Sequence, residues 1–97
     1  MTTTTDLLTA ARAEALFTSS LSTGTQPGHA TVAEAIRAAV RAHGGVRGCA
    51  ADVATEYGDH PEVAVPRMRW ARGVVDQLYG SGRADSRRQR GGWALVA

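Results

Sequence analysis

Three amphipathic segments, separated by glycines and prolines, place the strongest constraint on the fold of this chain. Apolar residues recur at helical spacing in residues 31–43, 46–57 and 66–79. Pro66 fits as the first residue of the third helix, because proline inside a helix removes a hydrogen bond; the alternative is one kinked helix from residue 61. A chain of 97 residues closes a single core, so these segments predict one small helical domain.

Signals at both ends of the first segment support a helix there. Thr31 and Glu34 match a capping box, in which the two side chains accept hydrogen bonds from free backbone N–H groups. Gly44 and Gly45 follow the segment and supply a left-handed stop. We therefore predict a helix over residues 31–43.

The N-terminal third of the chain predicts a further helix. Residues 1–5 are polar and repetitive, and we expect them to be disordered. Leucines and alanines at helical spacing predict a helix over residues 6–17, and a stretch rich in Ser, Thr, Gly and Pro over residues 18–30 predicts a linker. The expected roles of this helix are to dock on the domain or to pair with a second copy in a homodimer.

The C-terminal residues predict a β-hairpin. Gly80 and Gly82 end the third helix, and an arginine-rich run leads through a glycine pair to a short apolar strand. Trp93 and Leu95 alternate on one face of that strand. We therefore expect a hairpin with a basic tip and an apolar return strand.

The order of these elements over residues 31–97 resembles the winged helix-turn-helix domain. In AADVATEYG, Ala54 and Gly58 resemble the small residue and the turn glycine of a helix-turn-helix, and LYGSGRADSRRQRGGWAL is similar to a wing. The resemblance implies a mainly α fold with a three-helix core, a small C-terminal β-hairpin and an extra N-terminal helix. It also implies that the third helix lies in the major groove of DNA while the wing contacts phosphates.

Charge is distributed unevenly along the chain. The net charge is +2, but residues 1–64 hold four arginines and seven acidic residues, which gives −3. Residues 65–97 hold seven arginines and two acidic residues, which gives +5. An asymmetry of this size within one small domain favours a polyanionic partner.

The resemblance assigns these basic residues to double-stranded DNA. An arginine on the third helix can bind guanine O6 and N7 through two hydrogen bonds, and arginines of the hairpin can neutralise phosphates. The candidate DNA-binding residues are Arg67, Arg69, Arg72, Gln77, Arg83, Arg87, Arg88 and Arg90. Our leading hypothesis is a small DNA-binding protein, a transcriptional regulator or an accessory factor, that acts as a dimer and without a cofactor.

Several other classes of protein find no support in the sequence. Cys49 is the one cysteine, so no internal disulfide forms, and no Cys/His set has the ligand count of a structural zinc site. A phosphate-binding glycine loop, a nucleophile elbow and a catalytic carboxylate pair are all missing, so we expect no enzyme. No segment fits a signal peptide or a membrane span, and we expect a cytoplasmic protein.

A protein-interaction module is the alternative hypothesis. The same fold would then present a surface to a protein partner and bind no DNA. The acidic first two-thirds of the chain would serve that role, as would Trp70 at the edge of the apolar stripe of the third helix. Trp70 also fits a core position, where most aromatic residues beside such a stripe lie.

Overall fold

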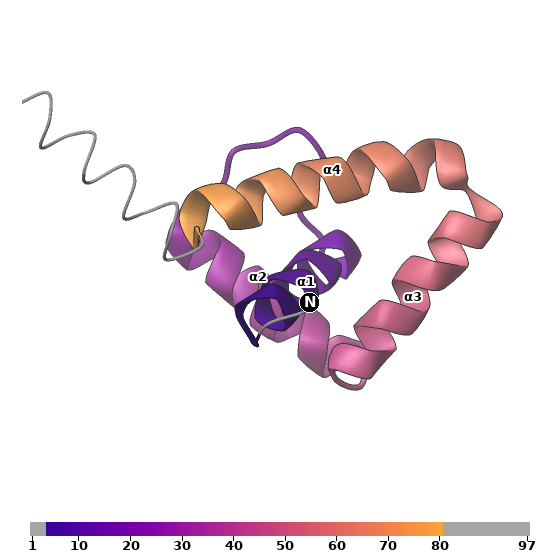
Figure 1. Ribbon diagram of the computed structural model, residues 1–97, viewed down its shortest axis with the longest axis horizontal. Coiled ribbons are helices and arrows are strands. Elements are labelled where there is room, and N and C mark those ends of the chain that lie inside the picture. Colours follow the sequence, from indigo (N-terminus) through magenta and orange to yellow (C-terminus); the bar gives the residue numbers. More distant parts are fainter. Residues whose placement is uncertain (1–3, 81–97) are drawn as a thin grey trace, which may run out of the picture.

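Four α-helices form the domain in the computed structural model, which describes residues 4–80. The helices are α1 (Thr4–Thr18), α2 (His29–Ala42), α3 (Val46–Asp59) and α4 (Pro61–Leu78). In Figure 1, α2, α3 and α4 form the sides of a triangle, and α1, viewed nearly end-on, runs through its middle. α1 is therefore the centre of the domain.

Small aliphatic side chains build the core around α1. The larger cluster joins α1, α2, α3 and α4, and Leu16, Val32 and Val75 are fully buried within it. A smaller cluster joins α1, α2 and α3 and consists of Ala15, Ala39 and Cys49. Because buried residues lie on several sides of α1, this helix cannot leave without opening the whole domain. None of the helices described is both long and apolar enough to cross a membrane.

The turn between α2 and α3 confirms the predicted glycine stop. Gly44 and Gly45 have φ angles of +79° and +110°, which L-residues with a side chain rarely adopt. α3 then starts so close to this turn that a Cβ atom on Gly48 would lie 1.5 Å from the backbone oxygen of His43. Only glycine fits at position 48 in this arrangement.

The predicted capping box of α2 is wrong. The helix begins at His29, two residues before Thr31, and its N-cap residue Gly28 makes no side-chain cap hydrogen bond. Glu34 instead pairs with arginines on the next turns of the helix, at 2.9 Å from Arg37 and 3.7 Å from Arg41. The Glu34–Arg37 pair, three residues apart, stabilises the helix from its surface, so the carboxylate is engaged away from the cap.

The alternative of a single helix from residue 61 is correct for α4. Pro61 occupies a position at the start of the helix, where its missing N–H has no intrahelical partner to lose, and Pro66 lies inside the helix. Glu62, whose backbone carbonyl Pro66 leaves without a hydrogen bond, is exposed, as is Pro66 itself. Water can therefore bind that carbonyl, which lowers the cost of proline at this position.

The segment between α1 and α2 is anchored to α4. The Trp70 indole donates a hydrogen bond from Nε1 to the backbone oxygen of Thr25 at 2.8 Å, and the rest of the side chain packs against the larger core cluster. At the C-terminal end of α4, the Tyr79 ring lies 4.0 Å from the Arg12 guanidinium and 4.8 Å from the His29 ring. These contacts tie the second half of the segment and the start of α2 to α4 and the residue after it. Trp70 takes the core-edge position that was one of its two possible roles.

The winged helix-turn-helix prediction is wrong. Its three helices were expected to pack on one another, whereas α2, α3 and α4 pack around α1. Gly58 lies inside α3 without a positive φ, and Ala54 is exposed, so neither residue forms the predicted turn. Residues 4–80 contain no strand. The predicted hairpin falls in residues 81–97, outside the described part of the chain.

Candidate functional site

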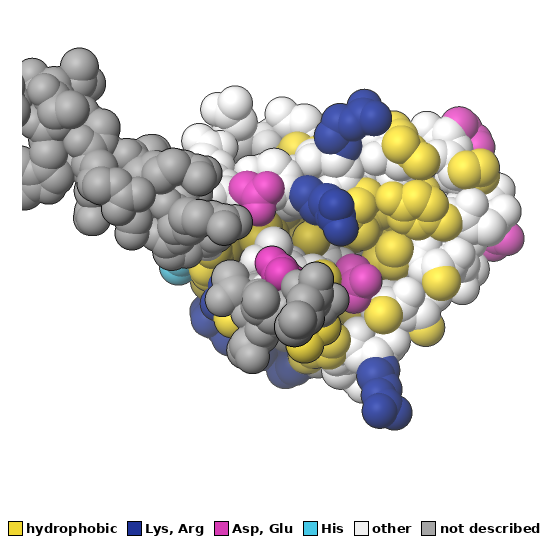
Figure 2. Space-filling view, in the orientation of Figure 1, with side chains coloured by type: hydrophobic (Ala, Val, Ile, Leu, Met, Phe, Trp, Pro, Cys, Tyr) yellow, Lys and Arg dark blue, Asp and Glu magenta, His cyan; other side chains and the backbone are white. Residues whose placement is uncertain are grey.

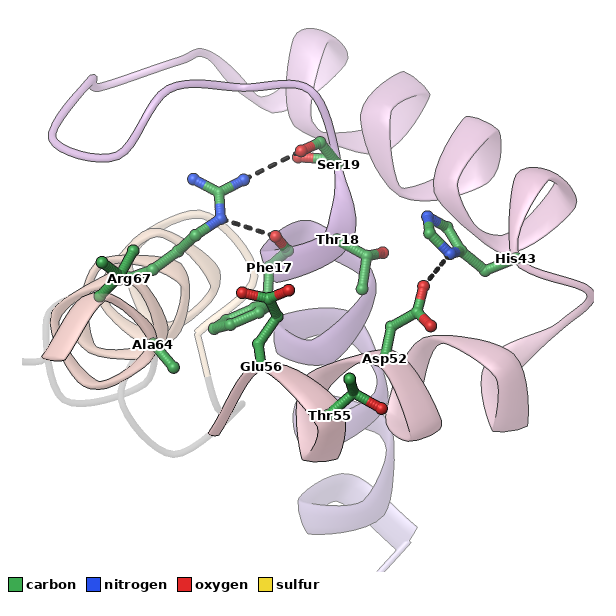
Figure 3. Close-up of a pocket in the computed structure, with 10 residues that line it drawn as sticks. Phe17, Thr18, Ser19, His43, Asp52, Thr55, Glu56, Ala64 and Arg67 are labelled. Atoms are coloured by element: carbon green, nitrogen blue, oxygen red, sulfur yellow. Dashed lines mark hydrogen bonds and ion pairs between the residues drawn. The ribbon is translucent and has the colours of Figure 1, made fainter. Parts of the chain in front are cut away.

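A groove opens where the C-terminal end of α1 meets α3 and the first turns of α4 (Figure 3). Its volume is about 370 Å³, within the range of small binding sites in proteins. The lining residues are Phe17, Thr18, Ser19, His43, Asp52, Thr55, Glu56, Val63, Ala64 and Arg67. We call this site the α1/α3/α4 groove.

The floor of the groove is apolar. Phe17 and Ala64 belong to the larger core cluster, with 4% and 1% of their surface exposed. The Phe17 ring stacks on Tyr57 of α3 with ring centroids 6.3 Å apart. Val63 borders the groove and is 56% exposed, although burial of a valine side chain is favourable. An apolar side chain placed here would cover surface that the described residues leave to water.

The α3 side of the groove is acidic. Asp52 and Glu56 line the groove, and Asp59 follows on the same face of α3, just outside the lining. Asp52 Oδ2 pairs with His43 Nδ1, and in Figure 3 the Glu56 carboxylate points into the space between Asp52 and Arg67. Within residues 4–80, the carboxylates of Glu56 and Asp59 have no ion-pair partner.

Arg67 forms the opposite side of the groove and is held by the end of α1. Its guanidinium donates hydrogen bonds from Nε to the Phe17 carbonyl at 2.7 Å and from Nη2 to the Ser19 carbonyl at 2.9 Å. A third bond runs from Nη1 to Thr23 Oγ1 at 2.7 Å. The last carbonyls of a helix have no partner within the helix, so Arg67 supplies one to Phe17. Burial lowers the pKa of the Arg67 guanidinium from its ordinary value.

Several polar side chains of the groove already make hydrogen bonds or ion pairs within the domain. Thr18 and Thr55 donate their hydroxyl hydrogens to backbone carbonyls of their own helices, at 2.9 Å and 3.1 Å. The pair between His43 and Asp52 orients the imidazole at the rim, 29% of whose side chain is exposed. The described residues include no cluster of three or more potential metal ligands.

The structure separates the predicted DNA-binding residues into three groups. Arg67 bonds to α1 and the following segment, while Arg69, Arg72 and Gln77 are exposed on α4. Arg72 also borders a smaller cavity of about 230 Å³ with two acidic residues, one of which is Asp76. The remaining predicted residues lie outside the described range: Arg83, Arg87, Arg88 and Arg90.

The exposed side of α4 carries balanced charge. Glu62 and Asp76 stand at its two ends, with Arg69 and Arg72 between them. Two cations and two anions on one helix face give no net attraction to phosphate. The expected approach of this helix to the major groove therefore has less electrostatic support than its arginine count suggests.

Arg67 carried a signal that the sequence analysis missed. Ala71 and Val74, both buried, follow it by four and seven residues, so the three side chains share one side of α4. An arginine beside an apolar stripe can cover core surface with its stem and keep its charged group at a polar edge. The acceptors of its hydrogen bonds lie about fifty residues earlier in the chain, and no local pattern identifies them.

Large apolar side chains are exposed at other points of the described surface. They are Leu7, Leu8, Val46, Tyr57, Val63 and Val65. Figure 2 shows apolar side chains gathered on one face of the molecule over the region between α3 and α4. Contiguous exposed apolar surface on a small domain is typical of contact with another protein.

Comparisons with protein-family models, with curated proteins and with solved structures find no match to this chain.

Proposed function

We propose that the protein is a protein-interaction module whose α1/α3/α4 groove binds a basic segment with an apolar anchor. One observation carries the proposal: the groove combines an exposed apolar side chain, Val63, with an unpaired carboxylate, Glu56, on its α3 side. This combination matches a segment in which arginine or lysine neighbours a large apolar residue. The apolar part would supply affinity and the charges would supply specificity.

The charge of the folded part supports a cationic partner. Residues 4–80 hold seven arginines and eight acidic residues, a net charge of −1. Four of those arginines already make contacts inside the domain: Arg12, Arg37, Arg41 and Arg67. Arg67 keeps its positive charge, because its hydrogen bonds go to uncharged oxygens. The lining of the groove therefore holds two carboxylates, Asp52 and Glu56, against one guanidinium, which leaves an excess of negative charge.

The apolar floor supports an anchor. Burial of one large apolar side chain contributes about 2 kcal/mol, enough for a weak and reversible complex when a few charge contacts are added. Val63 and Phe17 both line the space that such an anchor would enter. Binding of this kind needs no rearrangement of the core.

A peptide titration of the full chain, followed by backbone amide NMR, tests this function. The probe is a short peptide of arginines around one tryptophan, and its matched control has serine in place of tryptophan. We expect the first peptide to shift signals of Thr18, Glu56 and Val63, and Glu56→Gln to weaken its binding several-fold. Equal binding of the two peptides, or shifts spread evenly over the domain, would contradict an anchored groove.

DNA binding is the second candidate function. The observation in its favour is the net charge of +5 over residues 65–97, of which Arg69 and Arg72 are exposed on α4. Phosphate neutralisation by these arginines would make duplex affinity fall steeply with salt. A mobility-shift assay at two salt concentrations tests it: affinity should drop when Arg69, Arg72, Arg87 and Arg88 are replaced by Ala. Unchanged affinity in that variant would exclude this function.

A further inference from the structure

We propose that residues 87–96 of the same chain occupy the α1/α3/α4 groove and that a protein partner binds by displacing them. This inference rests on the proposed function, because it concerns the regulation of that same groove. The segment reads RRQRGGWALV, three arginines followed by a tryptophan and aliphatic residues. This composition matches the segment proposed to bind the groove: a basic part, followed after two glycines by an apolar anchor.

Charge complementarity is the first argument. Residues 81–97 hold four arginines and one aspartate, a net charge of +3, against −1 for residues 4–80. Glu56 lines the groove and Asp59 lies one turn further along α3; neither has an ion-pair partner within the described residues. Glu62, in the first turn of α4, has a 3.9 Å contact to His60. Three arginines of one segment can therefore approach three carboxylates at the junction of α3 and α4.

The shape of the groove is the second argument. A cavity of about 370 Å³ over Phe17, Val63 and Ala64 has room for the Trp93 side chain. An aromatic ring is favoured in such a place, since it buries a large apolar area. Trp93 follows Arg90 by three residues, so both can reach the same end of the groove.

Chain length permits the contact within one molecule. The groove lies at the start of α4, and the helix of 18 residues extends about 27 Å to its other end. Residues 81–93 can span at most about 43 Å when fully extended. The segment can therefore turn back along α4 and place Trp93 in the groove with length to spare. Closing a loop of this size carries a modest entropic cost.

Occupation by the chain's own segment would regulate the site. A partner could bind only those molecules in which the groove is free. Its apparent affinity would therefore equal its intrinsic affinity multiplied by the fraction of molecules with a free groove. Phosphate or another polyanion that holds the arginines would release the groove. Binding of a polyanion and binding of a protein partner would then be positively coupled.

Indole NMR signals of the full chain test the inference. The chain has two tryptophans, and Trp70 reports whether the domain is folded, while Trp93 reports the segment. We expect the Trp93 indole signal to differ from its position in a synthetic peptide of residues 81–97. Glu56→Arg and Val63→Asp should each return it to the peptide position while the Trp70 signal stays in place.

Val65→Asp is the matched control. Val65 is also exposed on α4, at 42%, but two residues after Val63 it points about 200° around the helix, away from the groove. This variant should leave the Trp93 signal unchanged. The inference is overturned if the wild-type Trp93 signal coincides with that of the peptide, or if neither groove variant moves it. A shift that disappears on dilution would assign the groove to the segment of a second copy and also overturn it.

The two proposals fail separately. If the arginine–tryptophan probe peptide binds the groove while Trp93 keeps the signal of the free peptide, the interaction function stands and self-occupation is wrong. If neither the probe nor Trp93 contacts the groove, both proposals are wrong.

Discussion

Replacement of Arg67 by alanine tests whether this residue stabilises the fold or serves only to bind a ligand. The side chain makes three hydrogen bonds, to Phe17, Ser19 and Thr23, at 2.7 to 2.9 Å. Hydrogen bonds from a charged donor contribute about 1.5–3 kcal/mol each, and holding an arginine side chain in place costs about 2 kcal/mol. Arg67 is only partly buried, so water competes for these bonds and the lower value applies to each. We therefore expect Arg67→Ala to lower the free energy of unfolding by about 3 kcal/mol.

Thermal and urea denaturation followed by circular dichroism measure this loss. For a domain of this size, a loss of about 3 kcal/mol lowers the melting temperature by roughly 12–24 °C. Arg67→Lys should keep only part of the stability, because one ammonium group cannot reach three acceptors in the geometry of the guanidinium fork.

Arg69→Ala is the control for this prediction. Arg69 is exposed two residues further along the same helix and has no ion-pair partner among the described residues. Surface substitutions of this kind change stability by less than about 0.5 kcal/mol. If Arg67→Ala and Arg69→Ala change the midpoint of unfolding equally, the structural role of Arg67 is refuted.

Local signals predicted the helices well. Apolar periodicity placed α2 and α3 within two residues of their observed ends, and the glycine pair after α2 has the backbone angles that a left-handed stop requires. These features depend on neighbours within about four residues, so one sequence is enough to identify them.

Contacts between distant segments were beyond that reasoning. A polar stretch after residue 17 suggested a linker, yet Arg67 and Trp70 hold it through backbone carbonyls of Ser19 and Thr25. A backbone acceptor has no side-chain identity, so the sequence does not mark it. For that reason the sequence left open whether α1 docks on the domain or pairs with a second copy, and the structure places it at the centre of the domain.

The winged-helix prediction failed through an ambiguity in two small residues. Alanine and glycine at Ala54 and Gly58 suit a tight turn, but they also suit the exposed side of a helix. Pro61 then starts α4 almost directly after α3, with only His60 between the helices. The groove itself could be predicted only in part, since the acidic face of α3 follows from residue spacing and the apolar floor follows from the packing of α1.

Two further predictions concern the surface of α2 and the start of α3. Arg37 lowers the pKa of the Glu34 carboxyl through a hydrogen bond and its charge, so this pair stabilises the fold above the ordinary Glu pKa and loses its effect as pH falls through the lowered value. An NMR titration should show the lowered pKa, and Arg37→Ala should raise it; an unchanged value contradicts the pairing. Gly48→Ala should prevent normal folding, because the added Cβ would lie 1.5 Å from backbone and neither α3 nor the turn can yield that far without opening the core. Gly58→Ala is its control: a Cβ there meets nothing within 4 Å, and alanine stabilises a helix by up to about 1 kcal/mol over glycine. Similar melting temperatures for the two variants would show that α3 does not approach the turn as described.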